Sequence, residues 1–132
     1  MFDIAKKLNV KLYFFDAESE CHKFGGKYRI FIDNRQSKQK QWQDFGHELG
    51  HVLCHAGHQL KMNHMFLKYQ EWKANNFMYH FCVPTFMLCQ LKEVNVHNVM
   101  DLFNVEYEFA CKRLASFSFK KHIIKTHHQN TL

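Results

Sequence analysis

The segment from about Gln39 to Gly57 constrains the fold more than any other part of the sequence. Its apolar residues recur at the spacing of an amphipathic helix, and Gly57 is the predicted helix end. His47 and His51 lie four residues apart in this segment, so both imidazoles project from one face of the predicted helix. The apolar stripe that must be packed elsewhere consists of Trp42, Phe45, Leu49, Val52 and Leu53.

Strand-forming residues precede this helix, and further helices follow it. Residues 10–15 and 28–32 have the composition of strands, Gly25 and Gly26 predict a turn, and the polar segment 16–23 predicts a loop. We therefore expect an α+β fold in which a small two- to three-stranded sheet packs on a helical core. The other predicted helices are a short one at 4–8, a long one at 64–82, a shorter segment at 84–92 that begins at Pro84, and two further short helices at 97–103 and 106–117.

The length and the cysteines predict a single cytoplasmic domain. The chain has 132 residues, which fits one domain over 1–117 followed by a basic, flexible tail at 118–132. No apolar run reaches the ~18 residues of a transmembrane helix, and the N-terminus lacks the apolar core of a secretory signal. The five cysteines lack CxxC spacing, which predicts buried free thiols in a reducing compartment.

The charge of the chain does not indicate a nucleic-acid partner. The net charge is +6, but the lysines and arginines are spread along the sequence. We find no RNA-binding signature and no glycine-rich phosphate loop. The 14 phenylalanines instead predict a packed aromatic core, and we interpret the basic residues as solvated helix faces.

His47, Glu48 and His51 have the spacing of a zinc peptidase motif. Two neutral imidazoles four residues apart on a helix can share one Zn²⁺, while Glu48 points into the site without being a ligand. There Glu48 would accept a proton from water and deliver it to the leaving amine. In a chain with 11 histidines the motif alone is not decisive, because a histidine-rich helix with solvated imidazoles has the same pattern.

A third ligand is therefore needed, and the sequence offers one. One zinc-peptidase pattern requires Gly three residues and His six residues after the second His, but Cys54 and Gly57 occupy those positions. His55 is on the same helix and could not complete a tetrahedron, so we expect it either to have a structural role or to support a ligand as a second-shell group. Glu71, on the next helix, would return to the metal if the two helices pack antiparallel, leaving one coordination position open for water.

These residues resemble the ImmA/IrrE family of metallopeptidases over about residues 10–115. The helix 71–82 has the family's Glu-x-x-Ala-Asn-x-Phe pattern, with Pro84 at the expected distance. Met78 departs from the pattern in place of a small residue, and Phe81-Cys82 replace an aliphatic pair; both changes resemble core substitutions. The matching segments are 44–55 (DFGHELGHVLCH), 71–77 (EWKANNF), 26–33 (GKYRIFID), Met100–Val105 and Arg113-Leu114.

The resemblance implies a zinc-dependent endopeptidase of the cytoplasm. His47, His51 and Glu71 would be the zinc ligands and Glu48 the general base. The implied substrate is a transcriptional repressor with a helix-turn-helix, encoded on a phage or mobile element, and a further protein would activate or restrain the enzyme. The alternative is a binding module that keeps the zinc fold and antagonises a repressor by sequestering it; an intact Glu48 favours catalysis.

Several further residues are candidates for supporting roles. The strand before the zinc helix is a candidate for pairing with substrate at a sheet edge, with Tyr28, Arg29, Ile30, Phe31 and Ile32. Asn75 lies one turn after Glu71 and is a candidate second-shell group. The helices at 97–117 resemble a helix-turn-helix only superficially, since Phe103, Val105, Phe109 and Leu114 have the pattern of a core. Candidate donors to an oxyanion are Tyr13, Tyr69, Tyr79, His80 and His97.

Overall fold

The computed structural model describes the backbone of residues 1–54 and 63–129, and the side chains of 1–54 and 63–118. His55 and the predicted helix end at Gly57 lie outside these residues. The fold is α+β, as expected. Its elements are α1 (Phe2–Lys7), β1 (Lys11–Phe15), β2 (Glu20–Phe24), β3 (Lys27–Asp33), α2 (Lys38–Cys54), α3 (His64–Cys82), α4 (Thr85–Leu88), α5 (Val96–Phe103) and α6 (Tyr107–Gln129).

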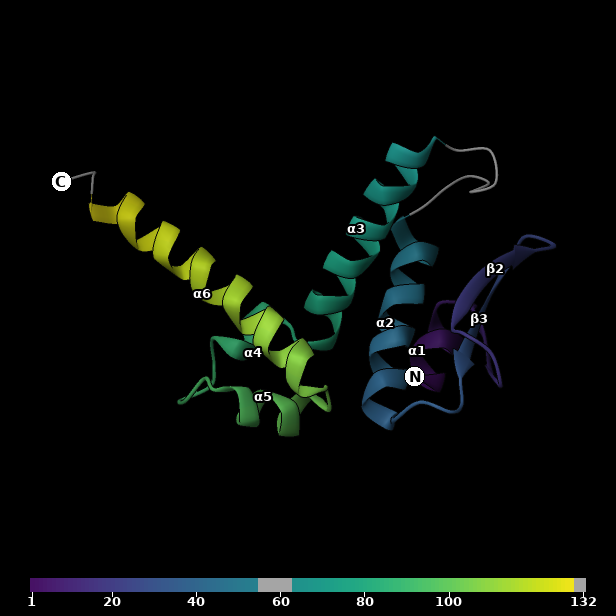
Figure 1. Cartoon of the computed structure of the whole chain (residues 1–132), viewed down its shortest axis with the longest axis horizontal. Coiled ribbons are helices and arrows are strands. Elements are labelled where there is room, and N and C mark those ends of the chain that lie inside the picture. Colours follow the sequence, from purple (N-terminus) through teal and green to yellow (C-terminus); the bar gives the residue numbers. More distant parts are fainter. Residues whose placement is uncertain (55–62, 130–132) are drawn as a thin grey trace. The chain divides into compact units, whose positions relative to one another are not determined.

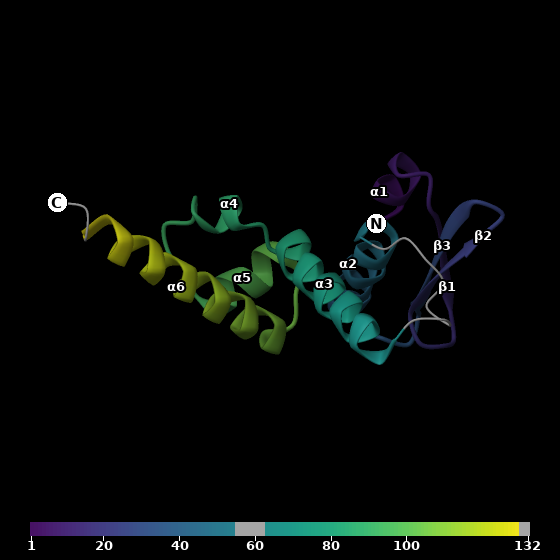
Figure 2. The same ribbon diagram turned by 90° about the horizontal axis from the view of Figure 1, so that it is seen from above.

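The chain divides into two compact units, Met1–Cys82 and Val83–Leu132. In the first unit α2 lies between the sheet and α3, and it contacts both (Figure 1). Helix α1 lies next to α2 (Figure 2), and its Ala5 belongs to the same buried cluster as Ile30 and Phe45. The prediction of one domain over 1–117 remains a prediction.

The sheet has the strand order β1-β3-β2. Strand β3 pairs in parallel with β1 and antiparallel with β2, with Tyr13 opposite Phe31 and Cys21 opposite Ile30. The prediction of a loop at 16–23 was wrong for its second half, because β2 begins at Glu20. The reason is the turn that follows. Gly25 and Gly26 both have positive φ, 59° and 76°, which is the geometry of a tight two-residue hairpin and requires a strand on each side.

One face of the sheet packs on α2. Ile30 and Ile32 of β3 are fully buried against Phe45 and Leu49 of the helix. The alternate residues of β3 point to the other face, as the two-residue period of a strand requires. Many of the aromatic side chains pack at this contact between the sheet and α2. Others pack at the α2–α3 contact, where the ring centroids of Trp42 and Phe81 lie 5.1 Å apart.

A polar turn joins β3 to α2. The carboxylate of the buried Asp33 accepts hydrogen bonds from the backbone and guanidinium of Arg35, at 2.8–3.0 Å. These bonds hold the pKa of Asp33 well below its usual range. The Asp33 backbone in turn donates to Ser19, whose hydroxyl donates to Asp44 on α2. This chain of bonds fixes where α2 starts relative to the sheet.

Two glycines of α2 allow close packing against α3. A Cβ on Gly50 would lie 3.0 Å from Ala74 Cα and 3.1 Å from the Ala74 carbonyl oxygen. A Cβ on Gly46 would lie 3.0 Å from Cys82 Sγ. At Gly50 the opposing atoms are backbone, so they cannot move aside by a change of rotamer. The two helices therefore approach backbone to backbone along this line.

The second unit contains α4, α5 and α6. Its core includes Phe103, Val105 and Phe109, which are buried as predicted, while Leu114 is half-buried. Arg113 is also buried: its Nε donates to the Val83 carbonyl at 3.0 Å and its second guanidinium nitrogen to the Thr85 hydroxyl at 2.7 Å.

Two boundaries in the second unit differ from prediction. The segment predicted as a helix at 84–92 is helical only over Thr85–Leu88, and the helix predicted to end at 117 continues to Gln129, so the backbone of the predicted tail is largely helical. Within the part of the chain that the structure describes, no helix is long and apolar enough to cross a membrane.

Gly50→Ala tests the close approach of α2 and α3. Overpacking against backbone costs about 1–3 kcal/mol, more than the ~1 kcal/mol that alanine gains in helix propensity. We expect a lower free energy of unfolding in urea titrations. Leu53→Ala is the control, because Leu53 is exposed on the same helix, and its effect should stay within about 0.5 kcal/mol. A stabilised Gly50→Ala protein would contradict the close contact.

Candidate metal centre

The candidate site is built from two adjacent helices of the first unit. His47 and His51 lie on consecutive turns of α2, on the same face. Glu71 lies on α3, one turn before Ala74, which packs on Gly50. The backbone contact at Gly50 therefore sets how far Glu71 is from the two histidines. The structure brings together the three residues that the sequence proposed as ligands.

The two imidazoles and the Glu71 carboxylate direct their donor atoms toward one another. His47 Nε2 and His51 Nε2 are 3.0 Å apart, and they lie 3.4 Å and 3.1 Å from the two carboxylate oxygens of Glu71. Donors bound to a tetrahedral zinc at about 2.0–2.1 Å are separated by roughly 3.3 Å. The spacing and the donor types thus fit a zinc ion, with two imidazoles and one carboxylate.

Asn75 determines which nitrogen of His47 faces the other donor atoms. The Asn75 side-chain oxygen lies 3.1 Å from His47 Nδ1. An amide oxygen only accepts hydrogen bonds, so Nδ1 carries the proton and the Nε2 lone pair is directed toward Glu71 and His51. This is the arrangement expected of an imidazole ligand held from behind. The contact places Asn75 where the sequence predicted a supporting group.

Glu48 is buried beside the donor atoms, with 7% of its surface exposed. Burial raises the pKa of Glu48 to about 8, and the carboxylates of Asp44, Glu71 and Glu20 add to the rise. Several acidic groups therefore face one small region. Such a cluster favours a bound cation, and it makes Glu48 a stronger base than an exposed carboxylate.

Cys21 of β2 is a site neighbour that the sequence did not identify. The cysteines were interpreted as core residues, but the Cys21 thiol lies near enough to Glu48 for the two groups to shift each other's pKa. Burial, together with the charge of Glu48, raises the pKa of this thiol to about 12. The Gly25-Gly26 pair was the available signal, because a two-residue hairpin turn implies a strand through Cys21.

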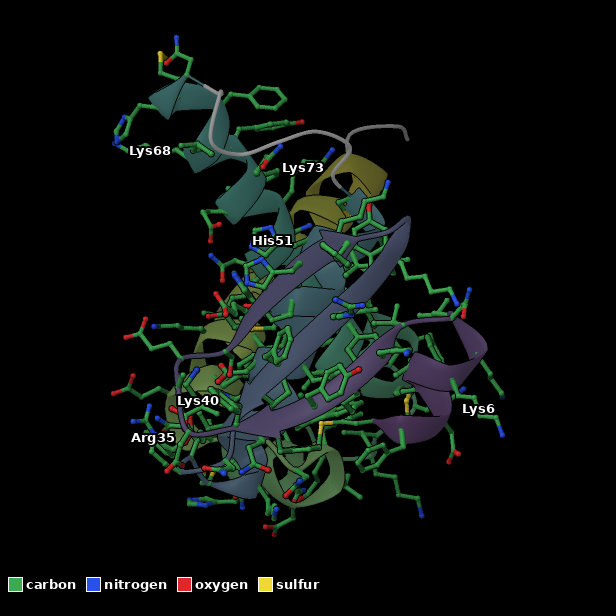
Figure 3. All side chains as sticks on the ribbon, turned by 90° about the vertical axis from the view of Figure 1, so that its right-hand side faces the viewer. Lys6, Arg35, Lys40, His51, Lys68 and Lys73 are labelled. Carbon is green, nitrogen blue, oxygen red and sulfur yellow. The ribbon has the colours of Figure 1, made fainter. Side chains whose placement is uncertain are left out.

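The expected substrate strand is not at an edge of the sheet. Tyr28, Arg29 and Ile30 belong to β3, which pairs with β1 on one side and β2 on the other. An added strand cannot hydrogen-bond to a strand whose two edges are occupied. The free edges belong to β1 and β2, and β2 contacts α2. Figure 3, which looks onto the sheet, shows His51 on the side where β2 lies.

The structure places the candidate oxyanion donors in different surroundings. Tyr13 stacks on Phe31 on the face of the sheet away from α2, and the exposed Tyr69 stacks on Trp72. His80 bonds to the Asn76 carbonyl, and His97 belongs to the second unit. The position of Tyr79 on α3 does not single it out. The donor stays unassigned.

The chain was compared with known proteins. A family model described as the IrrE N-terminal-like domain, peptidase family M78, matches residues 5–115. The phage-like element PBSX protein XkdA of Bacillus subtilis is 45% identical over 126 residues. The alignment covers 92% of this chain and 64% of XkdA, so the chain spans less than two thirds of that relative.

A second relative has no described activity. The uncharacterized protein YqaB of Bacillus subtilis is 38% identical over 122 residues, covering 86% of this chain and 69% of YqaB. No solved structure matches the chain. The family match covers most of the chain, including both helices that carry the histidines and the glutamate. The chain therefore belongs to the M78 family of metallopeptidases, whose conserved domain is the IrrE N-terminal-like domain.

Proposed function

We propose that this chain is a zinc-dependent endopeptidase that cuts a cytoplasmic transcriptional repressor of a phage or mobile element. The observation that carries the proposal is the triangle of donor atoms from His47, His51 and Glu71, with the buried Glu48 beside it. The relative XkdA is named as a protein of a phage-like element, which supports a substrate that belongs to a phage or mobile element. The five free cysteines support a reducing compartment.

In this proposal, different side chains bind zinc and transfer protons. His47, His51 and Glu71 would hold the zinc ion. When bound, zinc supplies a Lewis acid that polarises a peptide carbonyl and makes water more acidic. Glu48 takes a proton from the attacking water and then donates it to the leaving amine, and its burial keeps its basicity high enough for both steps. Asn75 holds His47 in the tautomer that binds.

The substrate would pair with β2 rather than with β3. In a two-residue hairpin the residues flanking the turn form a hydrogen-bonded pair, and such pairs alternate along the ladder. By that alternation Cys21 and Lys23 direct their backbone N–H and C=O groups to the free edge. An extended peptide added there would lie beside α2, on the side where Figure 3 shows His51.

Zinc binding is the first test. We expect the purified chain to retain about one zinc ion after dialysis, measured by atomic absorption. His47→Ala should lose it, because two remaining donors hold zinc weakly. His80→Ala is the matched control, since His80 bonds to the Asn76 carbonyl on α3. Equal zinc content in both variants would exclude the donor triangle as the binding site.

Glu48→Gln separates catalysis from binding. The zinc-loaded variant should fold and bind zinc, yet cleave at a rate lower by at least ~100-fold, because it lacks the base. The substrates are candidate helix-turn-helix repressors of phages and mobile elements and a peptide library from whole-cell protein, both followed by mass spectrometry.

Glu93→Gln, in the second unit, is the control for a change of charge. If Glu48→Gln relieved repression in cells as fully as the unchanged protein, the peptidase proposal would be wrong. Sequestration of the repressor would then be the better account.

Lys23→Pro tests the edge strand. Proline removes the backbone N–H directed to the free edge, which is tolerated on an edge strand. The KM for a cleaved peptide should rise roughly three- to tenfold, the value of about one hydrogen bond, with zinc content unchanged. Lys23→Ala keeps the N–H and controls for the lost side chain. Equal KM values for the two variants would argue against substrate pairing at β2.

A further inference from the structure

The face of the sheet that points away from α2 carries two adjacent rows of side chains. Directly opposite residues of paired strands share a face, so the register of the strands defines both rows. Lys11, Arg29 and His22 form a basic row across β1, β3 and β2. Two residues further along β1 and β3, Tyr13 and Phe31 form an aromatic row. We call this surface the outer face.

The aromatic side chains of the outer face are exposed although they are large. Tyr13 stacks on Phe31 with ring centroids 5.2 Å apart, and 41% of its surface is exposed. Phe24 is 69% exposed, and Arg29 lies 5.0 Å above its ring. Figure 3 looks onto this face, and none of the described helices of the first unit lies in front of it. Contiguous exposed apolar surface of this kind marks a site of interaction.

The basic row has little to balance its charge. Lys11 is directly opposite Arg29, and like charges in such a pair repel and destabilise the sheet. Among the described residues, neither side chain forms an ion pair with a carboxylate. The exposed acidic residue of this face, Glu20, bonds to His22 at 3.0 Å. Lys27, also on this face, adds a further positive charge.

We propose that the outer face is the docking site of an acidic segment of another protein. Carboxylates of the partner would lie over Lys11 and Arg29, and its apolar side chains would cover Tyr13 and Phe31. Charge complementarity selects this partner, because its carboxylates offset the repulsion within the basic row. Aromatic residues and arginine are also the side chains that are enriched at protein interfaces.

A single-stranded nucleic acid is the main competing occupant, because its bases also stack on aromatic rings. Proteins hold such a polyanion through many phosphate contacts, often about 6–10. The outer face offers Lys11, Lys27 and Arg29 for this purpose, which is too few for a long chain of phosphates. A short segment with a few carboxylates and apolar side chains matches the face better.

The outer face is separate from the candidate metal centre. Helix α2 packs on the opposite face of the sheet and lies between the sheet and α3 (Figure 1). His47 and His51 are on α2, and Glu71 is on α3. A partner on the outer face is therefore held by residues other than those that would bind zinc. Docking there does not depend on the proposed peptidase function.

Selection of short random peptides displayed on phage, with the full chain as bait, tests the docking site. The enriched peptides should combine several Asp or Glu residues with an aromatic one. Their binding, measured by fluorescence anisotropy, should weaken as the salt concentration rises. Tyr13→Ala should raise the Kd about tenfold and Lys11→Ala about threefold.

The matched controls are Phe86→Ala and Lys92→Ala, which remove an exposed ring and an exposed charge from the second unit and should leave the Kd unchanged. Enrichment of peptides without acidic residues would overturn the proposal. So would peptides that bind Tyr13→Ala as tightly as Phe86→Ala. Tighter binding of a single-stranded oligothymidylate than of any selected peptide, lost in Tyr13→Ala, would assign the face to nucleic acid instead.

Urea unfolding tests the repulsion within the basic row without any partner. Lys11→Gln removes one of the two opposed charges, so it should raise the urea midpoint by about 0.1–0.5 M, the effect of one cross-strand pair. High salt should reduce this rise, because it screens the repulsion. Lys92→Gln is the control and should leave the midpoint unchanged. A midpoint for Lys11→Gln that is unchanged or lower would overturn the proposal, since the row would then need no acidic partner.

Discussion

The contact on which the site depends is the packing of α2 against α3 at Gly50. Atoms of the Ala74 backbone stand where a side chain of residue 50 would be. One turn away, the Nε2 atoms of His47 and His51 lie 3.0 Å apart, and each lies 3.1–3.4 Å from one carboxylate oxygen of Glu71. A separation larger by the width of one methyl group would take Glu71 out of the coordination range of the histidines. The glycine thus costs helix propensity and in return gives the ligand geometry.

The carboxylates around the donor atoms all favour the binding of a cation. Glu71 is half exposed, with 53% of its side-chain surface accessible, and Glu48 is buried nearby. Glu71, Asp44 and Glu20 all raise the pKa of the buried Glu48. A divalent cation at the donor triangle would offset this repulsion. The acidic groups that are costly without a cation are the ones that favour binding it.

Local periodicity predicted the long helices and placed His47 and His51 on one face of α2, whereas Glu71 was proposed from the expected antiparallel packing of the next helix. The bounds of α3 were anticipated, and the four-residue spacing of His47 and His51 survives any packing of the helix. The order of the strands in the sheet could not be predicted from local patterns. That β3 is central depends on a parallel pairing with β1 from a distant part of the sequence, which no local pattern encodes.

The misplaced substrate strand and the overlooked Cys21 both follow from missing β2. The polar composition of 16–23 concealed a strand in which Cys21 alone is half-buried and the other residues are exposed. Similarly, the helix after Tyr107 extends beyond its apolar pattern, so composition predicted too early an end.

The division of the chain into two units has a consequence for how this family can diversify. The donor residues, the base, Asn75 and Cys21 all belong to Met1–Cys82. The second unit has its own core, closed by the buried Arg113 and its bonds to Val83 and Thr85. The contact that sets the spacing of the donor atoms, between Gly50 and Ala74, lies within the first unit. We therefore expect surface substitutions in the second unit to be tolerated without a change in that spacing.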